Sequence, residues 1–210
     1  MSCIEKAKFN TKKKTLRSSQ ARTERVQNLR SDYWQQVKQI DPENLVFIDE
    51  MGVLLGLTRT HARGDTPLGV GFAYRGARVY DFKPFYRGAK VTVIGAISIK
   101  QVVAVMTLNG STNSNAFKVF IEKCLLPQLW KGAVVVMDNL PAHKAAEIEP
   151  IIQSVGASVL YQSPYSPDFN PIEHWWSQLK AFLRQFSPTN SNRVDVLIAT
   201  ALDLVNPKHL

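Results

Sequence analysis

The chain has 210 residues, 45% hydrophobic and 20% charged, so it can bury a core and is not an intrinsically disordered tail. This length suits one domain with an appendage better than two full domains. Two cysteines without a C-x-x-C pair argue against a disulfide scaffold or a cysteine-ligated zinc site. No apolar stretch approaches the roughly 18 residues of a membrane span. We therefore expect a soluble, cytoplasmic protein that does not associate with membranes.

The positive charge is concentrated at the N-terminus. The formal net charge is +9, of which residues 1–40 contribute +7 and the remaining residues +2. Such a segment is either a solvated tail or an arm that follows a nucleic-acid backbone, in which case its binding weakens with salt. We expect residues 1–43 to form a basic arm with one helix. Its candidate DNA contacts are Lys12, Lys13, Lys14 and Arg17.

The first half of the chain predicts one polar helix followed by a buried strand. The helix is expected from Ser18 or Ser19 to about Lys38, and Asp41-Pro42 ends it. The apolar run Leu45–Ile48, like the later run Ala133–Met137, is typical of a strand buried on both faces. Because an aspartate follows each run, we expect both strands to end there.

A hairpin and a helix are predicted between these two runs. Val91–Ile99 and Val102–Leu108 are rich in β-branched residues and are separated by two polar residues, which is typical of a hairpin. A helix capped by Asn113 is expected to reach Trp130. Residues 51–90, which are rich in glycine and arginine, form an insertion whose structure the pattern does not determine.

After the second apolar run, the pattern predicts another helix and a short strand. The helix covers Pro141–Val155, where Pro150 is expected to kink or split it. Gly156 is its expected stop, and Ser158–Tyr161 is the strand. The chain therefore continues to alternate between strands and helices.

The C-terminal part predicts two helices. Asn170 is the expected N-cap of a helix that begins at Pro171 and runs to about Phe186. A last helix covers Asn192–Leu204. Taken together, the elements predict an α/β fold over residues 44–210, with a sheet flanked by helices.

Three acidic residues are candidates for a metal site. Asp49 and Asp138 each follow an apolar strand, and ligands of α/β sheets bind beyond the carboxyl ends of the strands. Glu173 lies one turn into the following helix. Three carboxylates drawn together repel each other unless a cation neutralises them, and Mg²⁺ prefers such oxygen ligands. We therefore predict metal-assisted phosphoryl transfer on nucleic acid, with two ions about 4 Å apart.

The helix of Glu173 also carries two candidate phosphate contacts. Its apolar stripe includes two tryptophans, which we expect in the core rather than stacked on bases. Lys180 and Arg184 fall on the same flank as Glu173, and Lys180 lies roughly 10 Å from it by helical rise. Either they contact the scissile phosphate and its neighbours, or the spacing is a coincidence on a solvated face.

Three motifs occur in order and at a characteristic separation. Thirty-four residues separate Asp138 from Glu173. Together the motifs resemble the catalytic half of a mariner-like DDE-superfamily transposase of the bacterial insertion-sequence branch, over about residues 44–205. The motifs are Phe47-Ile48-Asp49-Glu50, then Val136-Met137-Asp138-Asn139 with His143-Lys144, then Ser163-Pro164-Tyr165-Ser166-Pro167-Asp168-Phe169-Asn170-Pro171-Ile172-Glu173.

The resemblance implies an RNase H-like mixed sheet of strand order 3-2-1-4-5 flanked by helices. It implies a catalytic triad of Asp49, Asp138 and Glu173 that holds two Mg²⁺ ions, for which Mn²⁺ can substitute. Family members cut DNA at the ends of their element and join the freed 3′-hydroxyl to target DNA. Double-stranded DNA and a second copy of the chain are therefore the expected partners. Residues 51–90 correspond to an insertion that serves dimer contacts in eukaryotic relatives, so we expect a partner-contact region there.

Four further residues have expected roles near the triad. Asn139 and His143 are expected to orient a carboxylate or a water, although His143 could equally lie on a helix surface. Asp168 is expected to shape the Pro-rich turn. Glu50 should point away from Asp49 if the strand continues.

The resemblance leaves the source of end recognition open. Relatives carry helix-turn-helix domains before the catalytic domain, and the segment before Leu45 is too short for them. The chain is then a second reading frame, a truncated copy, or a form that needs a separate helix-turn-helix polypeptide for end recognition. The expected location is the cytoplasm, at the nucleoid. Three hypotheses stay open. The chain is a transposase that cleaves and joins DNA, a catalytically idle DNA-binding remnant, or an RNase H-like nuclease that does not join.

Overall fold

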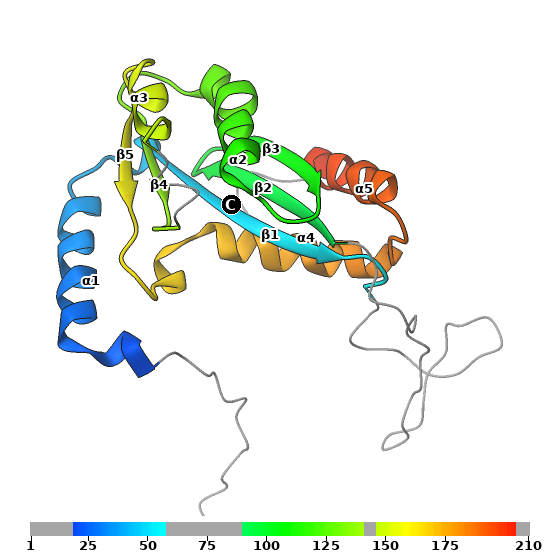
Figure 1. The fold of residues 1–210 in the computed structure, drawn as a ribbon, viewed down its shortest axis with the longest axis horizontal. Coiled ribbons are helices and arrows are strands. Elements are labelled where there is room, and N and C mark those ends of the chain that lie inside the picture. The colour runs from blue at the N-terminus through cyan, green and yellow to red at the C-terminus, as the bar shows by residue number, and fades with distance from the viewer. Residues whose placement is uncertain (1–18, 58–89, 141–145, 205–210) are drawn as a thin grey trace, which may run out of the picture.

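The computed structural model describes residues 19–57, 90–140 and 146–204 (Figure 1). Most of the predicted insertion lies outside these residues. So do five of the predicted site residues, Lys12, Lys13, Lys14, Arg17 and His143. Within the described ranges, no helix combines the length and the apolar character needed to cross a membrane.

A mixed sheet forms the centre of the molecule. Its five strands lie in the order β3-β2-β1-β4-β5, as predicted. β1 pairs antiparallel with β2 and parallel with β4, β2 pairs antiparallel with β3, and β4 pairs parallel with β5. The strands are β1 Leu45–Leu54, β2 Lys90–Ser98, β3 Val102–Asn109, β4 Val134–Met137 and β5 Ser158–Tyr161.

β1 is longer than the apolar run that predicted it. The expectation that Asp49 ends the strand is wrong, because β1 continues to Leu54 and stays paired with β2. Met51 and Val53 are buried whereas Gly52 is exposed, which is the alternation of a strand with one covered face. The acidic pair and the glycine are poor strand formers, but pairing with β2 overrides that weak preference.

Helices cover both faces of the sheet (Figure 1). The α-helices are α1 Glu24–Val37, α2 Ser114–Val119, α3 Ile148–Gln153, α4 Ile172–Phe186 and α5 Ser191–Leu204. α2 runs on into a π-helical segment, Phe120–Leu125. Short 3-10 turns are Ser19–Arg22, Pro42–Asn44, Leu126–Gln128 and Pro167–Phe169.

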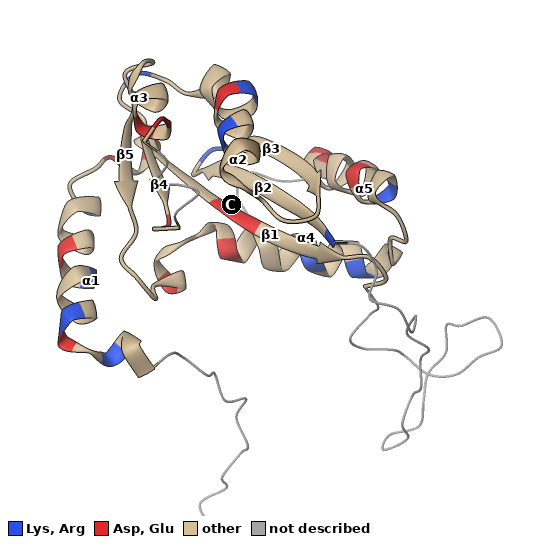
Figure 2. Ribbon diagram, in the orientation of Figure 1, with Lys and Arg blue, Asp and Glu red and all other residues tan. Residues whose placement is uncertain are grey.

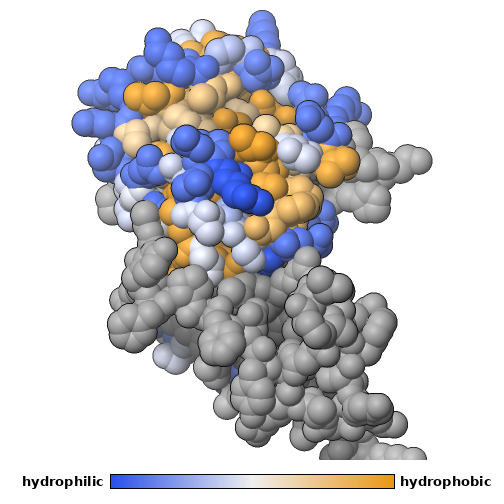
Figure 3. Space-filling view, turned by 90° about the vertical axis from the view of Figure 1, so that its right-hand side faces the viewer, coloured by the Kyte–Doolittle hydropathy of each residue, from blue (hydrophilic) through white to orange (hydrophobic). Residues whose placement is uncertain are grey.

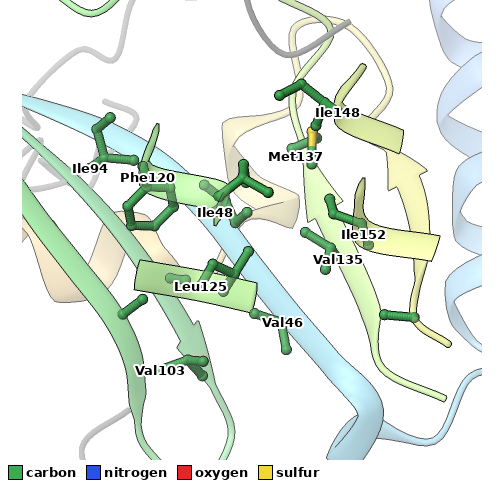
Figure 4. Close-up of a cluster of buried hydrophobic side chains, with 14 of the residues drawn as sticks. Val46, Ile48, Ile94, Val103, Phe120, Leu125, Val135, Met137, Ile148 and Ile152 are labelled. Atoms are coloured by element: carbon green, nitrogen blue, oxygen red, sulfur yellow. The ribbon is translucent and has the colours of Figure 1, made fainter. Parts of the chain in front are cut away.

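One apolar core fills the space between the sheet and the layer formed by α2, the π-helical segment and α3 (Figure 4). Val46 and Ile48 of β1 point into this core and are almost fully buried. Successive side chains of a strand point to opposite faces, so Phe47 and Asp49 face the other side. The core therefore fixes which face of the sheet carries the candidate aspartate.

The opposite face is covered by α4 and α5 and, towards β4 and β5, by α1. Met51 and Val53 pack there with Trp175 and Trp176 of α4. Tyr33 of α1 packs nearer β4, in a separate small cluster with Val136. Alternate side chains of β1 thus face different layers of helices, and the candidate aspartate faces the layer that contains α4.

Gly95 of β2 sets how closely α4 approaches the sheet. It is the pairing partner of Asp49. A Cβ atom at Gly95 would lie 2.6 Å from Cη2 of Trp176 and 2.9 Å from Cζ3 of Trp175, closer than such contacts occur. Only glycine at this position lets the two indole rings rest on the strand beside Asp49.

The helix starts and stops agree with the sequence in part. The Asn113 side chain accepts a backbone N–H of the first turn of α2, as predicted, and Gly156 adopts a left-handed φ of 77° after α3. The predicted cap of α4 is wrong, because Pro171 is the N-cap and the side chain of Asn170 makes no capping bond. The helix predicted over Pro141–Val155 is found in the described residues only as α3, Ile148–Gln153. Pro150 does not kink α3, because it lies in the first turn, where its missing N–H costs no helical bond.

The side of the molecule on which α5 lies is not uniformly polar. Large apolar side chains stay exposed there, and a view from this side shows hydrophobic patches between hydrophilic ones (Figure 3). Exposed large apolar residues of β1, α4 and α5 include Leu54, Phe186, Val196 and Leu204. None of these four residues lines the cavity described below.

Candidate active site

Asp49, Asp138 and Glu173 line one cavity of about 530 Å³. Asp49 comes from the middle of β1, Asp138 follows the last residue of β4, and Glu173 lies in the first turn of α4. Figure 2 shows acidic residues at these three places, around the end of β4 and the start of α4. The structure thus brings together side chains that are far apart in the sequence.

The register of two parallel strands explains why the aspartates meet. Phe47 of β1 pairs with Val136 of β4. The same register, continued by two residues, sets Asp49 beside Asp138, and neighbouring strands are only about 4.8 Å apart. The two-residue alternation also gives both side chains the face that α4 covers. β4 ends at this point while β1 continues, so the aspartates lie at a step in the sheet.

α4 is joined to this step through Trp176. The indole Nε1–H of Trp176 donates a hydrogen bond of 3.1 Å to Oδ2 of Asp49. Trp176 and its neighbour Trp175 are 2% and 4% exposed, which confirms the prediction that they are core residues. Glu173 precedes Trp176 by three residues, and residues three apart are neighbours on a helix surface. The contact between Trp176 and Asp49 therefore also places Glu173 beside the cavity.

The pKa of Asp49 is raised to about 6 from its ordinary value of 3.8, and burial is the largest cause. The negative charges of Glu173 and Asp138 contribute to this rise. Two hydrogen bonds oppose the shift, from the backbone N–H of Glu50 at 2.7 Å and from the indole of Trp176. The charges of Glu173 and Asp138 therefore act on Asp49, and a cation between the three carboxylates would relieve the repulsion.

Hydrogen bonds hold the ends of β4 and β5 together beside the cavity. Asp138 Oδ1 accepts the backbone N–H of Leu140 at 3.0 Å. The side-chain amide of Asn139 donates to the carbonyl oxygen of Gln162, and the N–H of Gln162 donates to the carbonyl oxygen of Met137 at 2.8 Å. Asn139, which we predicted as a supporting residue, lines the cavity. Its hydrogen bond to Gln162 links the ends of β4 and β5.

Several lining residues were not predicted from the sequence. Arg25 of α1 brings a positive charge to the lining. Gln162 and Asn170 are each 6% exposed, and among the described residues Nε2 of Gln162 and Oδ1 of Asn170 have no hydrogen-bond partner. The position of Gln162, directly after a strand that parallels β4, could have indicated it. Nothing in the sequence points to Arg25, because its place depends on how α1 packs.

The two predicted phosphate contacts lie further along α4. Lys180 and Arg184 follow Glu173 by seven and eleven residues, which places them on its side of the helix, and both are half-buried. They do not line the cavity. Figure 2 shows these basic residues further along α4 than the acidic residue near its start.

The donor set fits a hard divalent cation. Carboxylate oxygens and an unpartnered amide oxygen are the ligands that Mg²⁺ and Ca²⁺ accept. The raised pKa of Asp49 arises mainly from burial and in smaller part from the charges of Glu173 and Asp138, and a bound cation would offset both. In the described part of the chain, no three acidic, histidine or cysteine side chains are arranged to hold one ion by themselves. Mg²⁺ commonly takes one or two carboxylates per ion and keeps several waters, so the arrangement suits it.

Residues 44–194 match the DDE superfamily endonuclease family. Two curated transposases are similar in sequence. The Tcb1 transposase of Caenorhabditis briggsae is 26% identical over 110 residues, which are 50% of this chain and 40% of that transposase. The Tc1 transposase of Caenorhabditis elegans is 30% identical over 78 residues, which are 37% of this chain and 29% of that transposase. The chain thus matches less than half of the length of either relative.

Solved structures of the Mos1 mariner transposase share the fold. The Mos1 paired-end complex with Mn has a TM-score of 0.73 at 16% identity, over 96% of this chain and 61% of that chain. The Mos1 catalytic domain with Raltegravir and Mg has a TM-score of 0.62 at 16% identity, over 89% of this chain and 84% of that chain. With its mixed sheet, its carboxylate cavity and the match of residues 44–194, the chain belongs to the DDE superfamily endonuclease family and has the RNase H-like fold of the Mos1 catalytic domain.

Proposed function

We propose that this chain is the catalytic domain of a DNA transposase. With a divalent metal it cleaves phosphodiester bonds at the ends of its element and transfers the freed strand into target DNA. The observation that carries the proposal is the meeting of Asp49, Asp138 and Glu173 in one cavity. The family match and the similarity to transposases support the same chemistry.

The three carboxylates are the groups that would hold the metal, with Mg²⁺ as the expected ion and Mn²⁺ as its substitute. Two bound ions would supply Lewis-acid stabilisation of the attacking and leaving oxygens of the phosphodiester. The Mos1 structures with Mg and with Mn support this choice. Gln162 Nε2 is a free donor for a phosphate oxygen, and Oδ1 of Asn170 is a free acceptor for a water in the cavity.

DNA is proposed to run from the cavity along α4. Arg25 would contact a phosphate at the cavity, and Lys180 and Arg184 would contact phosphates further along the helix. Asn139 and His143 are proposed to support the triad. The basic arm would add backbone contacts through Lys12, Lys13, Lys14 and Arg17.

The proposed partners are double-stranded DNA, as element ends and as target, and a second copy of the chain. The Mos1 paired-end and strand-transfer complexes support both. A helix-turn-helix polypeptide that recognises the end sequences, the bacterial insertion-sequence origin and a location at the nucleoid belong to the same proposal. Residues 51–90 are the proposed partner-contact region.

Nicking of supercoiled plasmid DNA by the full chain tests the catalytic step. We expect nicking in Mg²⁺ or Mn²⁺ and its loss in Asp138→Asn and Glu173→Gln. The loss should exceed about 100-fold, because even partners outside the ligand set cost about 10–100-fold. Glu50→Gln is the matched control, since Glu50 lies next to Asp49 but points to the other face.

Each other outcome has a defined meaning. If Asp138→Asn nicks as fast as the unsubstituted chain, the activity is a contaminant and the proposal fails. If no nicking occurs in either metal, the chain acts as a DNA-binding remnant. Joining of a pre-cleaved 3′ end to a plasmid then separates a transposase from an RNase H-like nuclease, because the nuclease would nick without joining.

A further inference from the structure

Arg30 of α1 contacts the loop that leads into the active site. This loop, residues 163–171, runs from β5 to α4 and contributes much of the cavity lining. The guanidinium of Arg30 donates two hydrogen bonds to the carboxylate of Asp168, at 2.7 and 3.2 Å, and a third to Oγ of Ser166 at 2.7 Å. A two-pronged bond between guanidinium and carboxylate fixes orientation as well as distance. The side chain of Arg30 is 17% exposed, so solvent screens this pair only in part.

Aromatic contacts reinforce the same junction. The guanidinium carbon of Arg30 lies 4.3 Å from the centre of the Phe169 ring, within the range of a cation–π interaction. The rings of Tyr33 and Trp34, also in α1, stack on Phe169 at 5.7 and 5.9 Å between centroids. Three side chains from little more than one turn of α1 thus contact Phe169 and restrict its movement.

A hydrogen-bond chain carries this restraint into the loop. Ser166 donates its hydroxyl proton to the carbonyl oxygen of Pro164 at 3.0 Å and accepts from Arg30. Ser163 is then the donor in the 2.7 Å contact between the two serine hydroxyls. Both serines are buried, so these bonds are shielded from water. A change at Arg30 would therefore loosen several bonds of the loop at once.

Tyr165 shows that the loop needs an outside support. Its φ of 56° lies in the left-handed region, which is unfavourable for a residue with a Cβ and persists where surrounding contacts enforce it. Its hydroxyl donates to Oε1 of Gln20, in the 3-10 turn before α1. The segment that contacts the loop at Arg30 thus contacts it at a second point.

The loop continues into the first turn of α4 without a break in hydrogen bonding. The N–H of Asn170 donates to the carbonyl oxygen of Pro167 at 3.1 Å. The N–H of Glu173 donates to the carbonyl oxygen of Asn170 at 3.2 Å. Displacement of the 163–171 loop would therefore move the backbone of Glu173, whereas Asp49 and Asp138 are held by the sheet.

We infer that Arg30 is a positioning residue: by holding the 163–171 loop against α1, it sets where Glu173 stands in the carboxylate cavity. The inference rests on the proposed function, because it assigns Glu173 to metal binding. It gives α1 a role beyond that of a basic arm. α1 lies outside the stretch 44–194 that matches the endonuclease family, yet it holds one of the three carboxylates in place.

Mn²⁺ binding to the full chain, measured by isothermal titration calorimetry without DNA, tests this role. We expect Arg30→Ala to raise the dissociation constant about 10-fold, the lower range for residues that orient metal ligands. Arg30→Lys, which keeps the charge but loses the two-pronged geometry, should lie between Arg30→Ala and the unsubstituted chain. Lys38→Ala, at the exposed end of the same helix, removes the same charge and should change nothing.

Two further measurements separate positioning from general stability. Excess Mn²⁺ should restore the nicking rate of Arg30→Ala, because the variant is expected to lose occupancy of the metal site by Mn²⁺. In the metal-free protein, hydrogen exchange should accelerate in the 163–171 loop and the first turn of α4 and stay unchanged in β1. The double variant Arg30→Asp with Asp168→Arg should recover part of the Mn²⁺ affinity that either single change loses.

The outcomes distinguish this inference from the proposed function. If a folded Arg30 variant binds Mn²⁺ as tightly as the unsubstituted chain, the positioning role is overturned and the metal site stands. If the unsubstituted chain binds Mn²⁺ no more tightly than Asp49→Asn, both proposals are overturned. Should Arg30→Ala fail to fold, Arg30→Lys and the double variant carry the same test.

Discussion

Burial and neighbouring negative charges act together on the carboxyl group of Asp49. Its pKa of about 6 exceeds the ordinary 3.8, so between about pH 4 and pH 6 the folded chain binds more protons at this group than the unfolded chain does. Stability from this group is therefore greatest at low pH and falls as the pH rises through that window. Above it, the metal-free protein carries a buried charge that destabilises the fold.

We expect Asp49→Asn to stabilise the metal-free chain at pH 7, by on the order of 1–3 kcal/mol. The gain should shrink towards pH 4, where Asp49 is neutral in both states. Urea unfolding at several pH values in the presence of a chelator measures this, with Glu50→Gln as the control on the opposite face. A stability difference that does not change with pH would show that Asp49 does not titrate as described.

Trp176 is expected to tune Asp49 through its indole N–H. Trp176→Phe keeps an aromatic ring but removes the donor, so the pKa of Asp49 should rise further and protons should compete better with metal. Mn²⁺ affinity should fall at pH 6 and approach that of the unsubstituted chain at pH 8. Trp175→Phe, a change at the neighbouring buried ring, is the matched control. Equal effects of the two variants would assign the loss to packing instead of the hydrogen bond.

At the scale of elements, the contact between α4 and β2 determines the shape of the site. Gly95→Ala would force a Cβ within 2.6 Å of Trp176, and a rigid indole held by the core has little room to move. We expect a loss of about 1–3 kcal/mol in the free energy of unfolding, as for other overpacked cores, and a weaker metal site because α4 shifts. Thermal unfolding and Mn²⁺ titration measure the two effects.

Gly52→Ala is the control for this experiment. Gly52 lies in the neighbouring strand β1, and a Cβ there would contact the flexible end of the Lys90 side chain, with Cε at 3.0 Å. Lysine can move aside at little cost, so the variant should stay within about 0.5 kcal/mol of the unsubstituted chain. Equal destabilisation by the two substitutions would mean that the loss of glycine, and not the approach of α4, is responsible.

The sequence predicts these elements well wherever a local pattern decides them. The run Ala133–Met137 and the strand Ser158–Tyr161 are found almost as expected, because apolar continuity and flanking turns are local signals. The continuation of β1 past Asp49 was missed, since it depends on pairing with β2, which is distant in the chain. Asn170 is not the helix cap that the sequence predicts. An asparagine before a helix looks the same in the sequence whether its side chain caps the helix or faces a cavity.

The candidate site follows the same division. The sequence alone indicates the three carboxylates, because apolar runs and motif spacing can be read along the chain. They are Asp49, Asp138 and Glu173. Arg25 and Arg30 were not assigned to the site, because their contacts arise from the packing of α1 against the 163–171 loop. A long-range contact of this kind has no local pattern, so only the folded structure reveals it.

At the scale of the whole molecule, the net positive charge is concentrated in residues 1–40, whereas three carboxylates line the cavity. Deletion of residues 1–18 removes part of the basic segment without touching α1, so we expect weaker DNA binding and a shallower dependence of log affinity on log salt. Mn²⁺ affinity should not change. Binding of a DNA duplex measured over a range of salt concentrations checks this, and an unchanged slope would make the segment a mere tail.

Lys180 and Arg184 allow a second check of the proposed DNA path. Alanine at either position should lower the nicking rate by weakening a phosphate contact, while the melting temperature stays close to that of the unsubstituted chain. Arg193, on α5, is an exposed control. If the loss of thermal stability matches the loss of activity, Lys180 and Arg184 have only a structural role.

The central claim is that three carboxylates from β1, the end of β4 and the start of α4 hold divalent metal together. A crystal structure of the full chain grown with Mn²⁺, with the ions located by anomalous scattering, tests it most directly. We predict anomalous density in the cavity within coordination distance of Asp49, with Asp138 and Glu173 each ligating at least one ion. Density elsewhere, or a Glu173 side chain turned away from a metal bound by the aspartates, would contradict the account.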